Sequence, residues 1–172
     1  MSVVINGSAG VTTNSGAIYD GIQSATAQAS TSGTSIDFTG IPSWVKRITV
    51  IFDGVSTNST SPICIQLGDS GGIETAGYSG GASNQSPTYT ANTVGFNINS
   101  AVVAANTISG IATLVLISTN TWVMSAGTQM NATNVATAGG SKTLSDTLTQ
   151  IRITTVIGTN TFDAGSINIL YE

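Results

Sequence analysis

Short stretches of alternating hydrophobic and polar residues run along most of this chain, and they predict β-strands. The clearest stretch is SIDFTGIPSWVKRITVIFD, residues 35–53, in which a Gly-Ile-Pro-Ser break separates two alternating segments. In the second segment Ile48, Val50 and Phe52 share one face of the pleat, and Ile51 lies on the other. Because both faces carry apolar residues, we expect this strand to be covered on both sides and to form the spine of a core.

The same period returns at the spacing of strands in all-β sandwiches, with Gly, Asn, Pro and Ser between the segments. Gly80-Gly81 and Gly139-Gly140 are predicted turns. Residues 100–106 could form one helical turn, and no longer segment has a helical period. We therefore predict an all-β fold, an antiparallel β-sandwich of jelly-roll topology. The predicted strands are residues 35–39, 44–53, 62–68, 73–79, 93–99, 108–118, 121–128, 149–157 and 165–171.

The most regular hairpin pattern covers residues 111–128, with a Ser-Thr-Asn tip. Leu114 alternates there with Val115 and Ile117, which are also apolar. This strand is therefore predicted, like residues 44–53, to be buried on both faces.

Residues 1–34 differ from residues 35–172, and we assign the first range to an N-terminal arm or linker and the second to the sandwich. Residues 24–35 contain no large apolar side chain and predict an extended or loose linker. The arm could anchor the protein to a neighbour, by adding a strand to a sheet edge and by burying a short turn or helix, or it could be a frayed terminus. The residues predicted for assembly are Val3, Val4, Ile5, Ile18, Tyr19 and Ile22.

Charge is scarce in this chain of 172 residues, where 7% are charged against about 25% in ordinary soluble domains. Hydroxyl and amide groups could keep such a surface soluble, but we favour a surface hidden in an oligomer or assembly. The net charge of −4 gives no basic footprint, so nucleic acid is not an expected partner. Apolar runs fall short of the roughly 20 residues of a spanning helix, so a membrane is not expected either.

Candidate chemistry is sparse as well. Residues 68–72 spell GDSGG, the sequence around the nucleophile of trypsin-like serine proteases, but the chain has no histidine to act as base. We therefore predict a loop there, and a protein that is not an enzyme. Cys64, the single cysteine, is predicted to be a buried small hydrophobe. Trp44 and Trp122 are expected in the core or at its seam rather than on a sugar-binding surface.

No cofactor is expected, because a zinc site needs several His or Cys ligands and this chain has no His and a single Cys. Asp69 and Glu74 flank the glycine-rich loop and could share a hard cation, although solvated loop charges are the favoured interpretation. These two carboxylates, with Tyr78 and Tyr89, are also the residues of a candidate ligand loop.

Three blocks of this sequence resemble a known type of domain. Together they are similar to the jelly-roll-like β-sandwich domain of tailed-bacteriophage virion proteins, which occurs at tail-fibre tips and in small capsid-associated proteins. The resemblance covers most of the chain from about residue 34. The blocks are IDFTGIPSWVKRITV (residues 36–50), GIETAGY (72–78) and TFDAGSINILYE (161–172).

The resemblance implies a virion structural protein, commonly trimeric, without catalytic residues. Residues 1–34 are too few for a fibre shaft and a tail-attachment domain. A capsid decoration or cement protein of the head-fibre kind is therefore favoured, a homotrimer attached to the major capsid protein partly through its arm. We expect it on the phage particle surface after synthesis in the host cytoplasm without a signal peptide. The alternative is a module at a fibre tip that recognises a host surface glycan.

Overall fold

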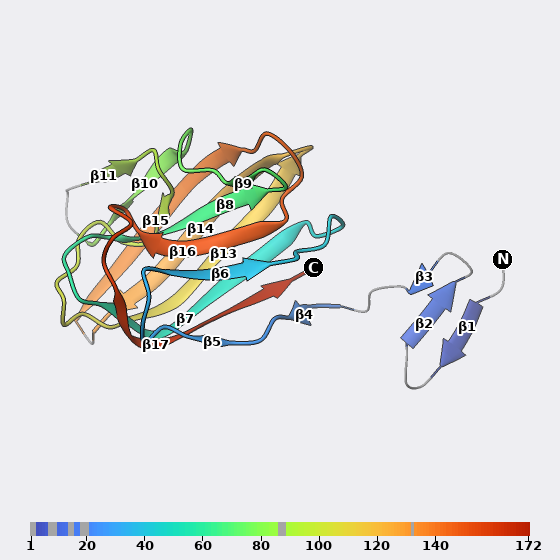
Figure 1. The fold of residues 1–172 in the computed structure, drawn as a ribbon, viewed down its shortest axis with the longest axis horizontal. Helices are drawn as coiled ribbons and strands as arrows, with labels where there is room; N and C mark the ends of the chain where they lie inside the picture. The colour runs from blue at the N-terminus through green and yellow to red at the C-terminus, as the bar shows by residue number, and fades with distance from the viewer. Residues whose placement is uncertain (1–2, 7–9, 14–15, 18–20, 86–88, 132) are drawn as a thin grey trace.

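The computed structural model describes residues 3–6, 10–13, 16–17, 21–85, 89–131 and 133–172, with side chains from residue 21 onward. Two antiparallel sheets pack face to face around one hydrophobic core, so the predicted β-sandwich is confirmed (Figure 1). The described ranges contain no helix, and hence none that is long and apolar enough to span a membrane. The jelly-roll connectivity remains a prediction.

The larger sheet contains the longest strands, and three of them, β13 to β15, follow one another as antiparallel hairpins. On its inner face Ile48, Leu114 and Met124 lie opposite one another on adjacent strands, and all three are buried. Its strands in spatial order are β11 (Thr90–Asn92), β10 (Ser79–Ser83), β15 (Asn134–Thr143), β14 (Thr121–Met130), β13 (Ile108–Ser118), β7 (Arg47–Thr57), β17 (Phe162–Tyr171) and β4 (Gln23–Ser24), with β5 (Gln28–Ala29) also paired to β17.

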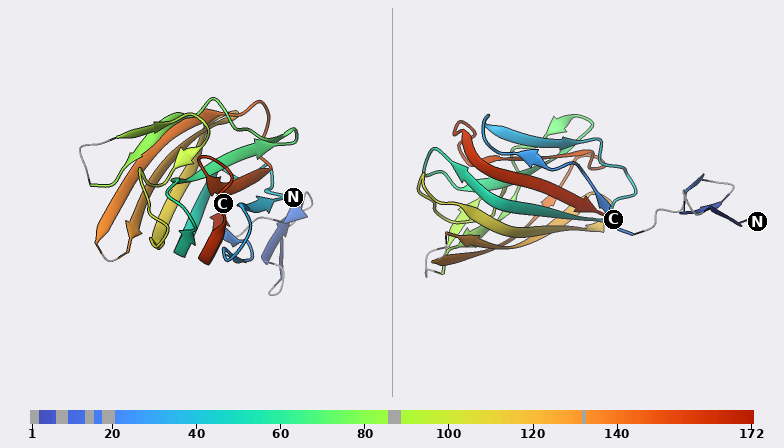
Figure 2. Two further views of the ribbon diagram at one scale, coloured as in Figure 1. Left: turned by 60° about the vertical axis from the view of Figure 1, so that its left-hand side comes forward. Right: turned by 90° about the horizontal axis from the view of Figure 1, so that it is seen from below.

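The smaller sheet lies over the inner face of the larger one (Figures 1 and 2). Ile36, Ile153, Ile65 and Phe96 lie in one row across its four main strands, and each is buried. Such cross-strand rows are the side chains that fill the space between two packed sheets. The strands in order are β12 (Phe96–Asn97), β8 (Ile63–Asp69), β16 (Gln150–Thr155) and β6 (Ser35–Thr39), with β9 (Gly72–Ile73) paired to β8.

Only one face of the larger sheet is covered. Phe52 on β7 is buried as predicted, whereas Ile51 on the other face is half-buried. On β13, Val115 and Ile117 are exposed although the sequence predicted burial on both faces. The reason is topological, because the smaller sheet packs on one side and no described segment packs on the other.

The segment from residue 23 to residue 30 belongs to the sandwich rather than to a loose linker. Strands β4 and β5 pair with β17, and Ser30 is fully buried, its amide donating to the Gly165 carbonyl at 2.9 Å. Backbone pairing holds this edge segment to β17 and its residues from 23 to 29 are exposed or half-buried, which is why it lacks the apolar pattern of a strand. The pairing that builds the sandwich therefore begins at residue 23, ahead of the boundary predicted at residue 34.

Ahead of that segment, β1 (Val3–Asn6), β2 (Gly10–Thr13) and β3 (Gly16–Ala17) form a separate three-stranded antiparallel sheet. We call this sheet alone the arm, which is a narrower range than the residues 1–34 assigned from the sequence. Figure 1 and the right-hand view of Figure 2 show it beyond the end of the sandwich, joined through the segment that carries β4.

Two pairs of glycines lie inside strands where the sequence predicted turns. Gly80 on β10 pairs with Gly140 on β15, and Gly81 pairs with Gly139. A Cβ on Gly80 would lie 2.5 Å from the Gly139 carbonyl oxygen and 2.8 Å from the Gly140 Cα, so the two strands approach closely only because both are bare there. Because the sequence analysis took both glycine pairs for turns, it predicted neither β10 nor β15.

Apart from two, the other strand predictions are confirmed. β6 and β13 have the predicted bounds, and the rest have shifted ends. Residues 73–79 form no continuous strand, since β9 ends at Ile73 and β10 begins at Ser79. Residues 93–99 contain only the two-residue strand β12. Both segments pair with β8 only through these short strands, and single bonds continue the contact: the Glu74 amide donates to the Leu67 carbonyl and the Ile98 amide donates to the Ile63 carbonyl.

Gly80→Ala should lower the free energy of unfolding by about 1–3 kcal/mol, because the added methyl group forces two backbones apart. Gly127→Ala on β14 is the matched control, since nothing lies within 4 Å of a Cβ at that position. Urea denaturation of both variants and the wild type measures the difference. An unfolding free energy of Gly80→Ala equal to that of Gly127→Ala would contradict the close approach.

Candidate functional site

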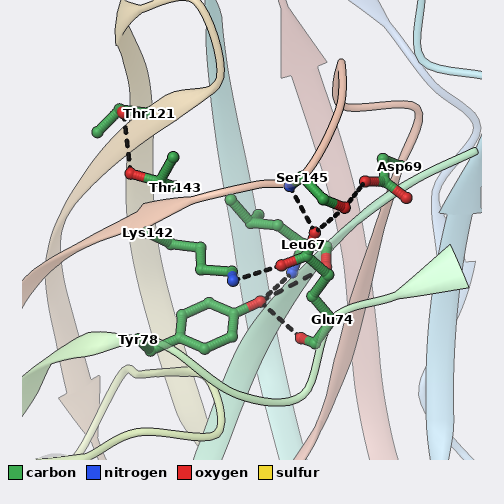
Figure 3. Close-up of polar contacts among 8 residues, drawn as sticks. All are labelled: Leu67, Asp69, Glu74, Tyr78, Thr121, Lys142, Thr143 and Ser145. Atoms are coloured by element: carbon green, nitrogen blue, oxygen red, sulfur yellow. Dashed lines mark hydrogen bonds and ion pairs between the residues drawn. The ribbon is translucent and has the colours of Figure 1, made fainter. Parts of the chain in front are cut away.

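The glycine-rich loop that follows β8 brings together three of the predicted ligand residues (Figure 3). Asp69 is the last residue of β8, and Glu74 and Tyr78 lie in the segment between β9 and β10. Lys142 of β15 and Ser145 just beyond it complete the group. The loop and the end of β15 are far apart in the sequence, and the packing of the two sheets places them side by side. We call these five residues the polar tie.

Lys142 is the central charge of the polar tie. Its side chain is only 6% exposed, and its ammonium forms an ion pair with the Glu74 carboxylate. The same nitrogen lies 5.4 Å from the centroid of the Tyr78 ring, within the range of a cation–π contact. A buried ammonium without a partner is costly, so the geometry of Glu74 and Tyr78 is what permits a lysine at this position.

Ser145 links the two carboxylates. Its hydroxyl oxygen lies 2.6 Å from Asp69 Oδ2 and 2.8 Å from Glu74 Oε1, and its backbone amide donates to Glu74 Oε1 at 2.8 Å. The hydrogen bond from Ser145 is the main cause that lowers the pKa of Asp69, followed by the bond from the Gly71 amide. Burial acts to raise the pKa of Glu74, but the bonds from Lys142 and Ser145 outweigh it and lower that pKa. Both carboxylates are therefore ionised at neutral pH.

Tyr78 fixes the other end of the polar tie. Its hydroxyl accepts a hydrogen bond from the Leu67 amide at 2.6 Å and donates to the Glu74 carbonyl at 3.0 Å. Its ring meets Phe96 edge to face, with 5.0 Å between centroids. Burial raises the pKa of the Tyr78 phenol, which thus stays protonated and able to donate. The residue is buried and its ring is not available to stack on a ligand.

The polar tie therefore connects the two sheets through hydrogen bonds and an ion pair. Asp69 and Glu74 are not the solvated loop charges that the sequence predicted, because Asp69 is buried and Glu74 is paired. Ser145 and Lys142 occupy the carboxylate oxygens that a hard cation would need. Within the residues that the structure describes, no three His, Cys, Asp or Glu side chains lie together as metal ligands would.

One sequence signal could have revealed Lys142. Residues 75–141 contain no charged residue, and Glu74 and Lys142 stand at the two ends of this stretch. Opposite charges that bracket a long uncharged segment are candidates for a pair. Ser145 gives no comparable signal in a chain so rich in serine.

Tyr89 lies apart from the other predicted ligand residues. It is 61% exposed on the outer side of the larger sheet, where its ring covers Gly81. A Cβ on Gly81 would lie 2.6 Å from the ring, so the glycine is what allows the tyrosine to lie on the strand. Beside it is a shallow hollow of about 270 Å³, which Ser83 and Thr137 help to line.

One side of β13, β14 and β15 is left uncovered by the smaller sheet, and we call it the outer face. Val115 lies opposite Val123 there, and Ile111 lies opposite Ile51 of β7. The remaining outward positions are mostly Thr, Ser and Gly, and none of those on the three strands is charged. Its exposed large apolar residues are Ile111, Val115, Ile117, Val123 and Val135.

The residues predicted for the arm are placed only in part. Val3, Val4 and Ile5 form most of β1, which pairs with β2. The predicted positions at residues 18 and 19 lie outside the described residues. Ile22 is exposed beside Arg47 and Leu170, at the end of the sandwich where the arm begins.

The predictions that Cys64 is buried and that both tryptophans lie in the core or at its seam are confirmed. Cys64 is buried, and burial raises the pKa of its thiol to about 12, so it is unreactive at neutral pH. Trp122 is buried in the core, and Trp44 packs against its margin near Tyr171.

Lys142→Met should destabilise the protein by about 3 kcal/mol, because it leaves the Glu74 carboxylate inside the polar tie without its cation. Adding Glu74→Gln to that variant should recover part of the loss, since a neutral amide keeps the bonds from Ser145. Urea denaturation at neutral pH measures both. A Lys142→Met protein as stable as the wild type would show that the ion pair contributes nothing.

Comparison with known proteins finds no match to this chain among protein-family models, curated proteins or solved structures. A two-sheet β-sandwich hosts many unrelated functions, so the fold alone indicates none. The candidate function of this chain therefore rests on the chemistry of its own surfaces.

Proposed function

We propose that this chain is a non-enzymatic structural protein of a tailed-bacteriophage particle. It acts as a capsid decoration or cement protein, assembles as a homotrimer, and attaches to the major capsid protein partly through its arm. The jelly-roll type of sandwich and the trimer come from the resemblance of residues 36–50, 72–78 and 161–172 to such proteins. The observation that carries the proposal is the outer face.

The outer face has the chemistry of an interface core. Interfaces between subunits are depleted in charge at their centres and combine apolar with uncharged polar groups. On the outer face the valines and isoleucines alternate with threonine, serine and glycine, which leave the surface flat. An uncharged sheet face with five exposed large apolar residues is typical of an interaction surface.

The mechanism that follows is mechanical. Each contact through valine, threonine or serine contributes little, but three linked copies bind a shell with a combined affinity far above that of one copy. The polar tie supports this role, because it closes the two sheets against each other at one end and keeps the outer face rigid. Catalysis has no part in it.

Ile111→Lys should dissociate the oligomer, because the ammonium would have to lose its water in the centre of the interface. The matched control is Ile157→Lys, at an isoleucine of similar exposure in the turn after β16, away from the outer face. We expect the wild type and the control to sediment as trimers at micromolar concentration, and Ile111→Lys to associate at least roughly tenfold more weakly.

A wild type that sediments as a monomer at these concentrations would overturn the oligomer. Equal association of Ile111→Lys and Ile157→Lys would exclude the outer face as its interface. The attachment to a particle has its own readout, which is the presence of the chain at many copies in purified phage particles, measured by quantitative mass spectrometry.

A second candidate function, the glycan-recognising module, is favoured by Tyr89 alone. An exposed aromatic ring held flat beside hydroxyl groups is a common platform for a sugar, because the ring meets the C–H face and the hydroxyls meet the sugar oxygens. In this case the protein should bind some of the glycans on an array. Tyr89→Ala should lose this binding, whereas Ile157→Lys should keep it. An array without any hit excludes this alternative.

A further inference from the structure

Two strands of this chain stand at the open ends of their sheets and are long enough to accept another strand. β6 ends the smaller sheet with five residues, and β1 ends the arm with four. The other end strands in the described ranges, β3, β4, β11 and β12, have only two or three residues. An unpaired strand edge presents a row of backbone donors and acceptors to any chain that can lie beside it.

The edge of β6 is open to hydrogen bonding. The Asp37 carbonyl points away from β16 and accepts a bond at 2.7 Å from the side-chain amide of Gln28, which belongs to β5 of the larger sheet. Backbone groups alternate in direction along an antiparallel strand, so Ser35 and Thr39 direct theirs to the same open side. β6 pairs with β16 in an unbroken register and contains no proline or lysine, so among the usual protections of an edge strand the described residues supply only the charge of Asp37 and the bond from Gln28.

A groove runs along this edge. It has a volume of about 360 Å³ and lies between β6, the β4–β5 segment and the end of β17. Phe38, Ile41, Ile169 and Tyr171 supply its apolar walls, and the polar groups of Gln28 and Asp37 lie at its rim. An extended strand placed there would bond to the β6 backbone and bury alternate side chains between the two sheets.

The arm has the chemistry that fits this groove. β1 has the sequence Val-Val-Ile-Asn, and residues 1–19 contain no charged side chain. β1 pairs with β2 along one edge only, so its other edge is free to pair with a second strand. Residues 23–29 are held along β17, and the arm lies beyond the end of the sandwich that this segment leaves (Figure 2).

We propose that β1 of one copy adds to β6 of a second copy, so that the arm extends the neighbour's smaller sheet across the groove. This inference rests on the self-association proposed above, and it names the segment and the edge that connect one subunit to the next. Whether it runs antiparallel or parallel to β6, the added strand forms hydrogen bonds with backbone groups of β6 that otherwise bond to water. It also closes the open seam of the sandwich with apolar side chains from the arm.

Disulfide trapping between full-length chains tests the contact. One set of variants carries a cysteine at Val4 or at Ile5, two positions that point to opposite sides of a strand, so one of them shares the side of Thr39. The other variant is Thr39→Cys, at an exposed residue of β6, with a tag that changes its mass. Buried Cys64 stays in place, because its raised pKa keeps it from reacting.

The matched control is Ala91→Cys, an exposed position on β11 at the open edge of the other sheet. Mixing an arm variant with Thr39→Cys under mild oxidation should give a mixed disulfide dimer for one of the two arm positions. We expect its yield to exceed that with Ala91→Cys by at least about fivefold, since tethering by β pairing raises the local thiol concentration.

Equal yields with Thr39→Cys and Ala91→Cys, or no mixed dimer, would overturn the inference. A chain that carries both cysteines and forms only an internal disulfide would overturn it too, because the arm would then cover its own sandwich. Sedimentation of the same samples separates this result from the proposed function. A trimer without the mixed disulfide disproves the arm contact alone, whereas a monomer disproves the self-association.

Discussion

Burial of one row of side chains against another, between two sheets that each offer a single apolar face, is the interaction on which this fold depends. Ile48, Leu114 and Met124 of the larger sheet face the row of the smaller sheet that contains Ile153 and Ile65. Each fully buried side chain of this size contributes about 1.5–3 kcal/mol from its removal from water. The chain has few charges, so these contacts act with little help from surface ion pairs.

Packing of the smaller sheet on one face of the larger sheet leaves the other face exposed. A strand has two faces, and the smaller sheet covers only one face of β13, β14 and β15. Residues 75–141 contain no charged side chain, so the outward positions of these strands carry only apolar and uncharged polar groups. The apolar outward residues are costly in a lone subunit and useful in an assembly, which is why the outer face carries the functional proposal.

The polar tie shows how a charge is accommodated inside such a protein. Lys142 is on an inward position of β15, where an apolar residue would be expected, and it is tolerated because Glu74 and Tyr78 surround its ammonium. Ser145 then connects Glu74 to Asp69. The GDSGG loop, which resembles a protease motif over five residues, thereby serves to fasten the smaller sheet to the larger one.

The strands with a strong alternation of large apolar residues could be predicted from the sequence. β6 and β13 have the predicted bounds, and the all-β class followed from the same pattern. β10 and β15 could not be found this way. Their glycines are turn signals in isolation, and only the close approach of the partner strand makes bare backbone the favourable choice at Gly80 and Gly140.

The sequence by itself determined which residues are apolar and how they alternate, and this set the fold class, the buried Cys64 and the near absence of charge. Only the tertiary structure decided which face each strand buries, because that depends on where the second sheet packs. It also decided that residues 23–30 join the edge of the larger sheet and that Lys142 meets Glu74. These contacts join segments that are distant in the chain, and a local sequence pattern does not show which distant segments come together.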